Sequence, residues 1–203
     1  MFVELTDVLL CPNAHDQTHC VLTTEEVRGR RVVGGVVGCP ICEREYPIVD
    51  GVVQFGPDPL LKVGSRGDDL TVEEMPEPGD VQALLGLVGA GGYVVLLGSV
   101  ARLAGELAGS MPGSHFVAVN PPPEVHESES LSVLRAECSI PIRSRAVRGV
   151  VVGREYAREL WLGEASRVLL DGLNLVVAAT DVEIPGVEQV AVGRSLWVGR
   201  KTS

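Results

Sequence analysis

The chain has 203 residues, of which 45% are hydrophobic, 22% are charged and only 4% are aromatic. This length fits one large domain or two small ones, and the hydrophobic content excludes a disordered or collagen-like chain. The formal net charge of −10 disfavours a nucleic-acid-binding surface, because phosphate contacts require clustered lysine and arginine side chains.

Composition divides the chain into a first domain at residues 1–56, a linker at 57–80 and a second domain at 81–203. The first domain holds four of the five cysteines and short strands around glycines. The linker is predicted to be extended and solvated, because its later part carries acidic residues with no basic residue between them. These residues are Asp68, Asp69, Glu73, Glu74, Glu77 and Asp80.

Predicted helices and strands alternate through the second domain. Helices are expected near residues 81–88, 100–108 and 155–170. Strands are expected at residues 93–97, 115–119, 131–135, 147–152, 173–179, 187–192 and 195–198. Apolar strands alternating with helices indicate a parallel sheet covered on both faces, and Gly193 and Arg194 give the last two strands hairpin spacing. The predicted fold class is therefore α/β, with a Rossmann-like, mostly parallel sheet and a C-terminal antiparallel hairpin.

Targeting and membrane signals are weak in this sequence. The first ten residues contain Glu4 and Asp7 and lack a basic start followed by an apolar run, so we expect a cytoplasmic protein. Residues 81–101 are uncharged over a length that could span a bilayer, but glycines interrupt them. A helix, a glycine turn and a buried strand explain this stretch, and no membrane span is expected.

The N-terminal cysteines have the spacing of a metal site. Cys39 and Cys42 form a complete Cys-x2-Cys knuckle, and Cys11 opens a second, irregular one. In a reducing compartment this pattern favours metal over disulfides, and two knuckles together complete a tetrahedron. Four protein ligands leave no open position, so the predicted zinc is structural.

The fourth ligand is open to alternatives. We favour His15, because Cys11-x3-His15 keeps both ligands in one turn and leaves Cys20 to begin an apolar strand. Cys20 is the alternative, and His19 is a further one. A thiol cluster without metal is the remaining interpretation.

Residues 5–55 resemble the small zinc-ribbon family that activates methyltransferases. The likeness lies in the Leu-Leu-Cys-Pro at 9–12, the Cys-Pro-Ile-Cys at 39–42 and the Tyr-Pro-Ile-Val-Asp-Gly-Val-Val at 46–53. His15 departs from the family pattern, in which a second cysteine is usual, and Val53 stands where proline is common. The resemblance implies a zinc ribbon that covers apolar surface by extending the sheet of a methyltransferase.

The second domain resembles the class I S-adenosylmethionine-dependent methyltransferase fold. The residues that carry this resemblance are the glycine turn and strand at 91–99, the turn and strand at 166–177 and the final hairpin. The family's cofactor loop turns on three glycines, but here Gly98 is followed by Val100 and Arg102 at the positions of the next two. Asn120 replaces the acidic residue that holds the ribose hydroxyls. The resemblance leaves Gly98, Ser99 and Asn120 as the residues of a degenerate cofactor site.

Other candidates have simpler structural explanations. Arg102 could hold an anion, although a solvated or ion-paired arginine is the expected role. Cys138 is expected to be a small buried residue of the core. Trp161 and Trp197 are expected to be core or interface anchors.

These observations favour a zinc-binding, non-catalytic methyltransferase-like protein, a pseudoenzyme that acts as a binding or scaffold module. The alternative is an active methyltransferase with a divergent cofactor loop that binds S-adenosylmethionine. A ribbon fused to an unrelated α/β domain with a small ligand is a third interpretation. The expected partner is another protein or a second copy of the chain, with no nucleic acid and no membrane.

Overall fold

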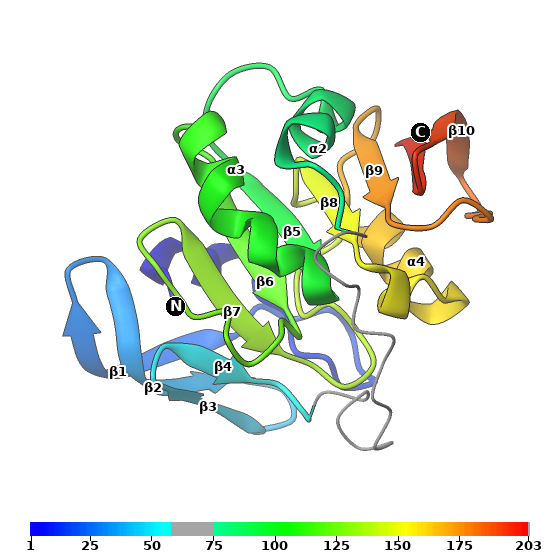
Figure 1. Cartoon of the computed structure of the whole chain (residues 1–203). Helices are drawn as coiled ribbons and strands as arrows, with labels where there is room; N and C mark the ends of the chain where they lie inside the picture. Colours follow the sequence, from blue (N-terminus) through cyan, green and yellow to red (C-terminus); the bar gives the residue numbers. More distant parts are fainter. Residues whose placement is uncertain (58–74, 203) are drawn as a thin grey trace.

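The computed structural model describes residues 1–57 and 75–202. Its strands form one continuous sheet in the order β1-β2-β3-β4-β7-β6-β5-β8-β9-β11-β10 (Figure 1). Most of the predicted linker, residues 58–74, lies outside the described residues. Among the residues that are described, no helix is long and apolar enough to cross a bilayer.

The first four strands form an antiparallel meander at one end of the sheet. They are β1 (Val21–Arg28), β2 (Arg31–Gly38), β3 (Glu45–Val49) and β4 (Val52–Gln54). Asp50 and Gly51 join β3 to β4 in a tight turn that has positive φ at both positions, 49° and 79°. β4 then pairs in parallel with β7, with Val53 opposite Leu134, so the cysteine-bearing segment and the rest of the chain share one sheet.

The remaining strands confirm the predicted α/β fold class. Five strands run in parallel, namely β5 (Tyr93–Leu97), β6 (His115–Val119), β7 (Leu131–Arg135), β8 (Gly149–Val152) and β9 (Asn174–Val177). β10 (Val187–Gly193) and β11 (Leu196–Lys201) form the hairpin, with β11 antiparallel to both β9 and β10. Gly193 belongs to the strand, and the turn consists of Arg194 and Ser195, which both have positive φ.

The helices differ from the predicted ones in their bounds. They are η1 (Val3–Val8), α2 (Pro78–Leu85), η3 (Gly98–Leu103), α3 (Ala104–Ser110), η4 (Arg154–Tyr156) and α4 (Glu159–Val168). The helix predicted at 155–170 is divided, because Arg158 has an extended backbone (φ −128°, ψ 151°) between η4 and α4.

Both faces of the parallel sheet are covered, as the sequence predicts. In β5, Val94 and Leu96 face α2 and α3, whereas Val95 and Leu97 face the opposite side. On that opposite side the core includes α4 and apolar residues of the N-terminal segment. The core of the sheet therefore draws on residues from both ends of the chain.

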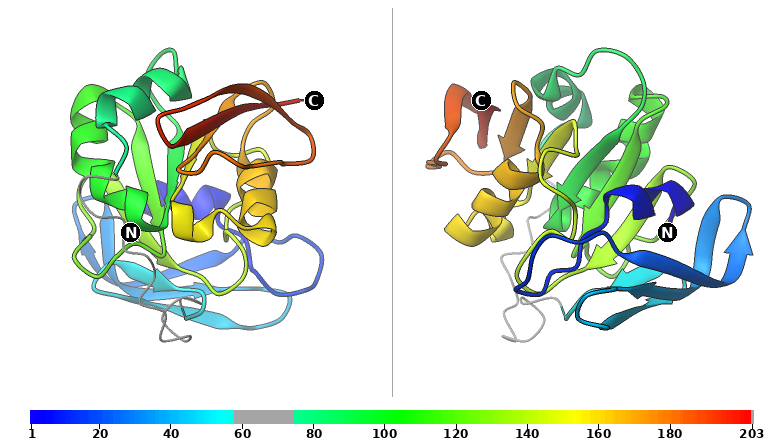
Figure 2. Two further views of the ribbon diagram at one scale, coloured as in Figure 1. Left: turned by 45° about the vertical axis from the view of Figure 1, so that its right-hand side comes forward. Right: turned by 180° about the vertical axis from the view of Figure 1, so that it is seen from behind.

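The N-terminal segment lies where the sheet has no crossover helices of its own. Parallel strands are usually joined by helices, but residues 120–130 between β6 and β7 and residues 136–148 between β7 and β8 contain none. Figure 2 shows the N-terminal segment, in dark blue, lying across these strands when the molecule is seen from behind. The Leu10 N–H donates to the Pro141 carbonyl at 3.1 Å, which ties this segment to the β7–β8 loop.

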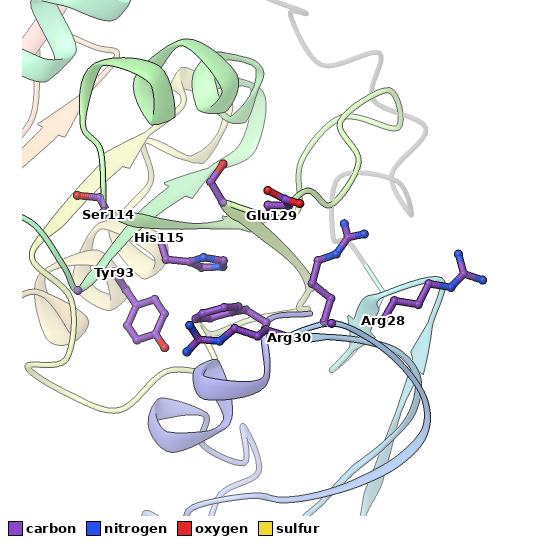
Figure 3. Close-up of a pocket in the computed structure, with 12 residues that line it drawn as sticks. Arg28, Arg30, Tyr93, Ser114, His115 and Glu129 are labelled. Carbon is purple, nitrogen blue, oxygen red and sulfur yellow. The ribbon is translucent and has the colours of Figure 1, made fainter.

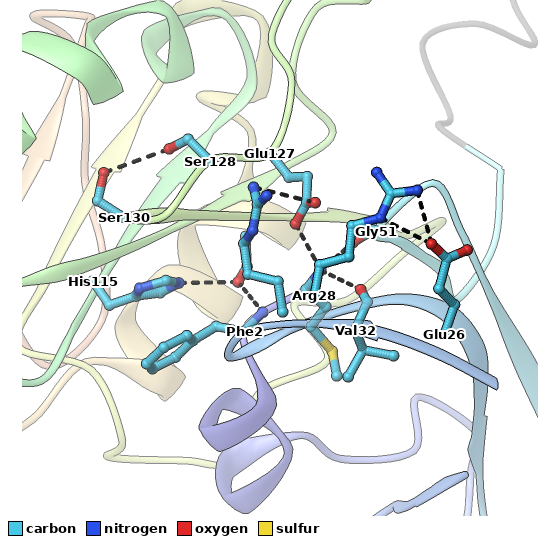
Figure 4. A network of polar contacts seen from close by, with 12 residues as sticks. Phe2, Glu26, Arg28, Val32, Gly51, His115, Glu127, Ser128 and Ser130 are labelled. Atoms are coloured by element: carbon cyan, nitrogen blue, oxygen red, sulfur yellow. Dashed lines mark hydrogen bonds and ion pairs between the residues drawn. The ribbon is translucent and has the colours of Figure 1, made fainter. Parts of the chain in front are cut away.

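A buried polar network also joins the N-terminal segment to the β6–β7 loop (Figure 4). The Met1 ammonium group donates to the carbonyl oxygens of Val32 at 2.9 Å and Gly51 at 2.7 Å, and to a carboxylate oxygen of Glu127 at 2.9 Å. Burial lowers the pKa of this ammonium group, and the hydrogen bond with Glu127 opposes that shift. The network thus fastens the edges of β2 and β4 to the loop after β6.

The helix-free β7–β8 loop is also held by Arg167 of α4. Its guanidinium donates to the Ile140 carbonyl at 2.7 Å and the Ile142 carbonyl at 2.8 Å, and it pairs with Glu164 at 2.7 Å. Charged hydrogen bonds of this kind each contribute roughly 1.5–3 kcal/mol. We expect Arg167→Ala to lower the free energy of unfolding by about 2–3 kcal/mol in urea denaturation. Arg194→Ala, at a position 87% exposed, is the control and should change it by less than about 0.5 kcal/mol.

Three expectations about individual side chains can be compared with the structure. Trp161 and Trp197 are buried, in agreement with a core role. Arg102 pairs with Glu124 at 2.7 Å and is ion-paired as expected. The prediction for Cys138 is wrong, because this cysteine is exposed in the loop after β7 rather than buried in the core.

Candidate metal centre and cofactor loop

Two turns bring the four favoured metal ligands together. Cys11 and His15 lie on the loop that follows the N-terminal segment, whereas Cys39 follows β2 and Cys42 precedes β3. The knuckle at 39–42 closes because the Glu43 N–H donates to the Cys39 carbonyl at 3.0 Å. Glu43 has a φ of 56°, and the chain reverses direction there before it enters β3.

The ligand atoms of Cys11, His15, Cys39 and Cys42 all lie within 4.8 Å of one another. The Cys11 and Cys42 sulfurs are 3.7 Å apart, and the Cys39 sulfur is 3.4 Å from His15 Nε2. In a tetrahedral zinc site the Zn–S and Zn–N bond lengths imply edges of about 3.8 Å between sulfurs and about 3.6 Å between sulfur and nitrogen. The donor set and its spacing therefore fit a zinc ion.

Outer contacts hold these ligands in position. His15 Nδ1 lies 2.6 Å from the Asp16 carbonyl, which leaves Nε2 to face the sulfurs. The Asn13 amide donates to Cys42 Sγ at 3.2 Å, and the Tyr46 hydroxyl lies 3.1 Å from Cys11 Sγ. Donors directed at sulfur stabilise thiolates, which are the form that binds metal.

The pKa values of Cys42 and Cys20 are shifted in opposite directions. A backbone hydrogen bond from Arg44 lowers the pKa of Cys42 to about 6, which favours the thiolate. Burial raises the pKa of Cys20 to about 12, and this cysteine is not among the four clustered ligands. Burial also raises the pKa of Cys11, with the Tyr46 hydrogen bond acting in the opposite direction. The geometry thus favours His15 over Cys20 as the fourth ligand.

The predicted cofactor loop begins where β5 ends. Gly98 has a φ of +80°, a conformation that favours glycine, and turns the chain into η3. The Glu155 carboxylate accepts hydrogen bonds from the Ser99 N–H and, at 3.0 Å, from the Ser99 hydroxyl. A Cβ placed on Gly98 would meet the Glu155 carboxylate and would lie 2.6 Å from the Tyr156 ring. The space against the loop backbone is therefore filled by η4.

The other predicted cofactor residue, Asn120, has a structural role. It follows the end of β6 with a φ of 51°, and its side-chain amide donates to the Ala136 carbonyl at 2.8 Å. Its side-chain oxygen accepts from the Ala136 N–H, also at 2.8 Å. Both polar atoms of this buried side chain thus join the end of β6 to the end of β7.

Glu155 is the residue that sequence reasoning missed. The residues at 153–156 are typical of a helix start, and nothing in their pattern indicates a contact with Ser99, which lies 56 positions away. The parallel pairing of β5 with β8 places Leu97 opposite Val152, so the segments after both strands meet at one edge. Only this long-range pairing identifies Glu155 as part of the loop.

No protein-family model and no curated protein sequence matches this chain. Solved structures do match, although at low identity. A complex of the Haloferax volcanii Trm112 methyltransferase activator with a putative methyltransferase matches at 15% identity and a TM-score of 0.48, covering 62% of this chain and 88% of that one. The Burkholderia thailandensis 1,6-didemethyltoxoflavin-N1-methyltransferase matches at 13% identity and a TM-score of 0.48, covering 70% of this chain and 82% of that one. The antibiotic-resistance methyltransferase Kmr matches at 12% identity and a TM-score of 0.45, covering 64% of this chain and 94% of that one.

The chain has a Rossmann-type, mostly parallel sheet together with a cysteine and histidine cluster that could bind zinc. At these identities and TM-scores the matches carry no conclusion about this chain. What the chain binds has to be argued from its own residues.

Proposed function

We propose that this chain is a zinc-binding, methyltransferase-like protein without methyl-transfer activity, which acts as a binding or scaffold module. The observation that carries the proposal is the position of Glu155. Its carboxylate accepts the Ser99 N–H and hydroxyl and lies over Gly98, where a cofactor would approach the loop backbone.

A cofactor would have to displace this internal ligand. Removing Glu155 from Ser99 breaks two hydrogen bonds to a charged acceptor, an unfavourable step that adds to the cost of binding. Val100 is fully buried beneath the loop, and its β-branched side chain disfavours the positive φ that glycine would supply. Asn120 offers a neutral amide in place of a carboxylate, and both its polar atoms are already paired.

The ribbon has a structural role in this proposal. A zinc ion held by Cys11, His15, Cys39 and Cys42 would fix the turns that carry β2 and β3, and β4 adds these strands to the edge of β7. The ribbon would thereby stabilise its own neighbour within one chain. The exposed edge strands β1 and β10 offer pairing surfaces for a protein partner or a second copy.

Calorimetric titration tests the absence of cofactor binding. We expect no heat of binding when the zinc-loaded chain is titrated with S-adenosylmethionine or with S-adenosylhomocysteine, because Glu155 and Tyr156 fill the loop. A melting curve and a zinc measurement on the same sample serve as controls for folding. Micromolar binding of either compound would contradict the proposal and favour an active methyltransferase.

A further inference from the structure

A cavity of about 830 Å³ lies at the amino ends of the parallel strands, opposite the cofactor loop at their carboxyl ends. It opens between the β1–β2 hairpin and the amino ends of β5, β6 and β7 (Figure 3). Its chemically distinctive lining residues are Arg28, Arg30, Arg31, Tyr93, His115 and Glu129. Pockets of roughly 300–1,000 Å³ are typical of small-molecule sites. The volume is therefore adequate for a metabolite.

The lining is basic in a protein whose net charge is −10. Three guanidinium groups line the cavity and only one carboxylate, that of Glu129, does so. Each guanidinium has a glutamate neighbour outside the lining, in the pairs Arg28–Glu26, Arg30–Glu4 and Arg31–Glu127. Arginine has five N–H donors, and exposed ion pairs contribute little to stability. An anion can therefore recruit Arg28 and Arg30 without a large loss, whereas Arg31 pairs with Glu127, whose side chain is only 13% exposed.

The other wall of the cavity is aromatic. The Phe2 ring stacks on the His115 imidazole with centroids 4.3 Å apart, and Tyr93 packs edge-on against His115 at 5.9 Å. Burial and the Met1 ammonium group lower the pKa of His115 to about 4, so the imidazole is neutral at neutral pH. Burial raises the pKa of Tyr93 to about 12, so its hydroxyl stays a hydrogen-bond donor.

We propose that this cavity binds a phosphorylated small molecule with an aromatic ring, of the size of a nucleoside monophosphate. Guanidinium forks suit phosphate oxygens, and the face of Tyr93 suits a planar ring. The Phe2 ring supports this wall from behind, because it stacks on His115 and the Arg30 guanidinium lies over it at 5.0 Å. In Figure 3, Arg30 extends toward Tyr93, and Glu129 lies on the other side of the site, where its carboxylate can accept hydrogen bonds from ligand hydroxyls. The site is independent of the cofactor loop and of the proposed function.

Calorimetry on the full, zinc-loaded chain tests the site with adenosine monophosphate as the probe. We expect a dissociation constant below about 1 mM, and binding at least tenfold weaker for adenosine and for inorganic phosphate given separately. Adenosine monophosphate that does not bind, or that binds no more tightly than either fragment, would overturn the proposal.

Arginine variants locate the binding. Arg28→Ala combined with Arg30→Ala should weaken the binding of adenosine monophosphate at least about tenfold, because two side chains that donate hydrogen bonds to the phosphate are lost. These side chains are 67% and 70% exposed, so the variant should keep the melting temperature of the parent. Arg194→Ala removes an exposed arginine elsewhere, at a side chain 87% exposed, and should leave the affinity unchanged. Equal affinity in the double variant and the parent would place the ligand outside this cavity and overturn the proposal.

Discussion

Replacing Cys39 with serine is expected to lower the free energy of unfolding of the whole chain by at least about 3 kcal/mol, because structural zinc sites contribute folding energy directly. The effect should reach beyond the N-terminal strands, since Cys39 shares a core with Trp161 and Trp197 of the α/β part. Urea denaturation followed by tryptophan fluorescence measures this loss of stability. Both tryptophans lie far along the sequence from the metal ligands, so their fluorescence reports unfolding of the α/β part.

Cys138→Ser is the matched control for this change. Cys138 is exposed and is not among the clustered ligands, so its replacement should alter stability by less than about 0.5 kcal/mol. An unchanged tryptophan-detected transition in Cys39→Ser would contradict a metal that supports the sheet.

Removal of residues 1–56 is expected to abolish cooperative folding of the remainder. The deletion would leave β7 without its neighbour β4 and would uncover the sheet face that carries Val95, Val117 and Val150. No helix in the β6–β7 or β7–β8 connections is present to replace the lost cover. Calorimetry should show no unfolding transition, and sedimentation should show aggregation through the exposed apolar face.

Adding residues 1–56 as a separate chain provides the control. If the N-terminal segment acts by covering the sheet, the added chain should restore a soluble complex with a cooperative transition. A fragment of residues 57–203 that folds cooperatively alone would show that the two parts are independent, in conflict with the shared sheet and core.

The sequence predicts the fold class because that information is local. Alternating apolar strands and helices indicate the parallel sheet, and the short spacing before Ser195 indicates the final hairpin. The knuckle of Cys39 and Cys42 is equally local, since two ligands lie in one turn. The same reasoning favours His15 over Cys20, and the His15 ring lies with the thiols of Cys11, Cys39 and Cys42.

Features that depend on distant pairing could not be predicted. Glu155 reaches Ser99 only because β8 pairs with β5, and the basic cavity exists only because the β1–β2 hairpin lies near the amino end of β6. The exposure of Cys138 has a similar cause. The β7–β8 connection has no helix, so a residue that composition assigns to a core lies instead on a surface loop.

Native mass spectrometry of the full chain, purified without chelator and mixed with S-adenosylmethionine, tests the central claim most directly. The account predicts a folded charge-state distribution at the mass of one chain, or of two in a dimer, with one zinc ion per chain and no nucleoside adduct. A folded chain without zinc would contradict the metal site, and a stoichiometric S-adenosylmethionine adduct would contradict the closed cofactor loop.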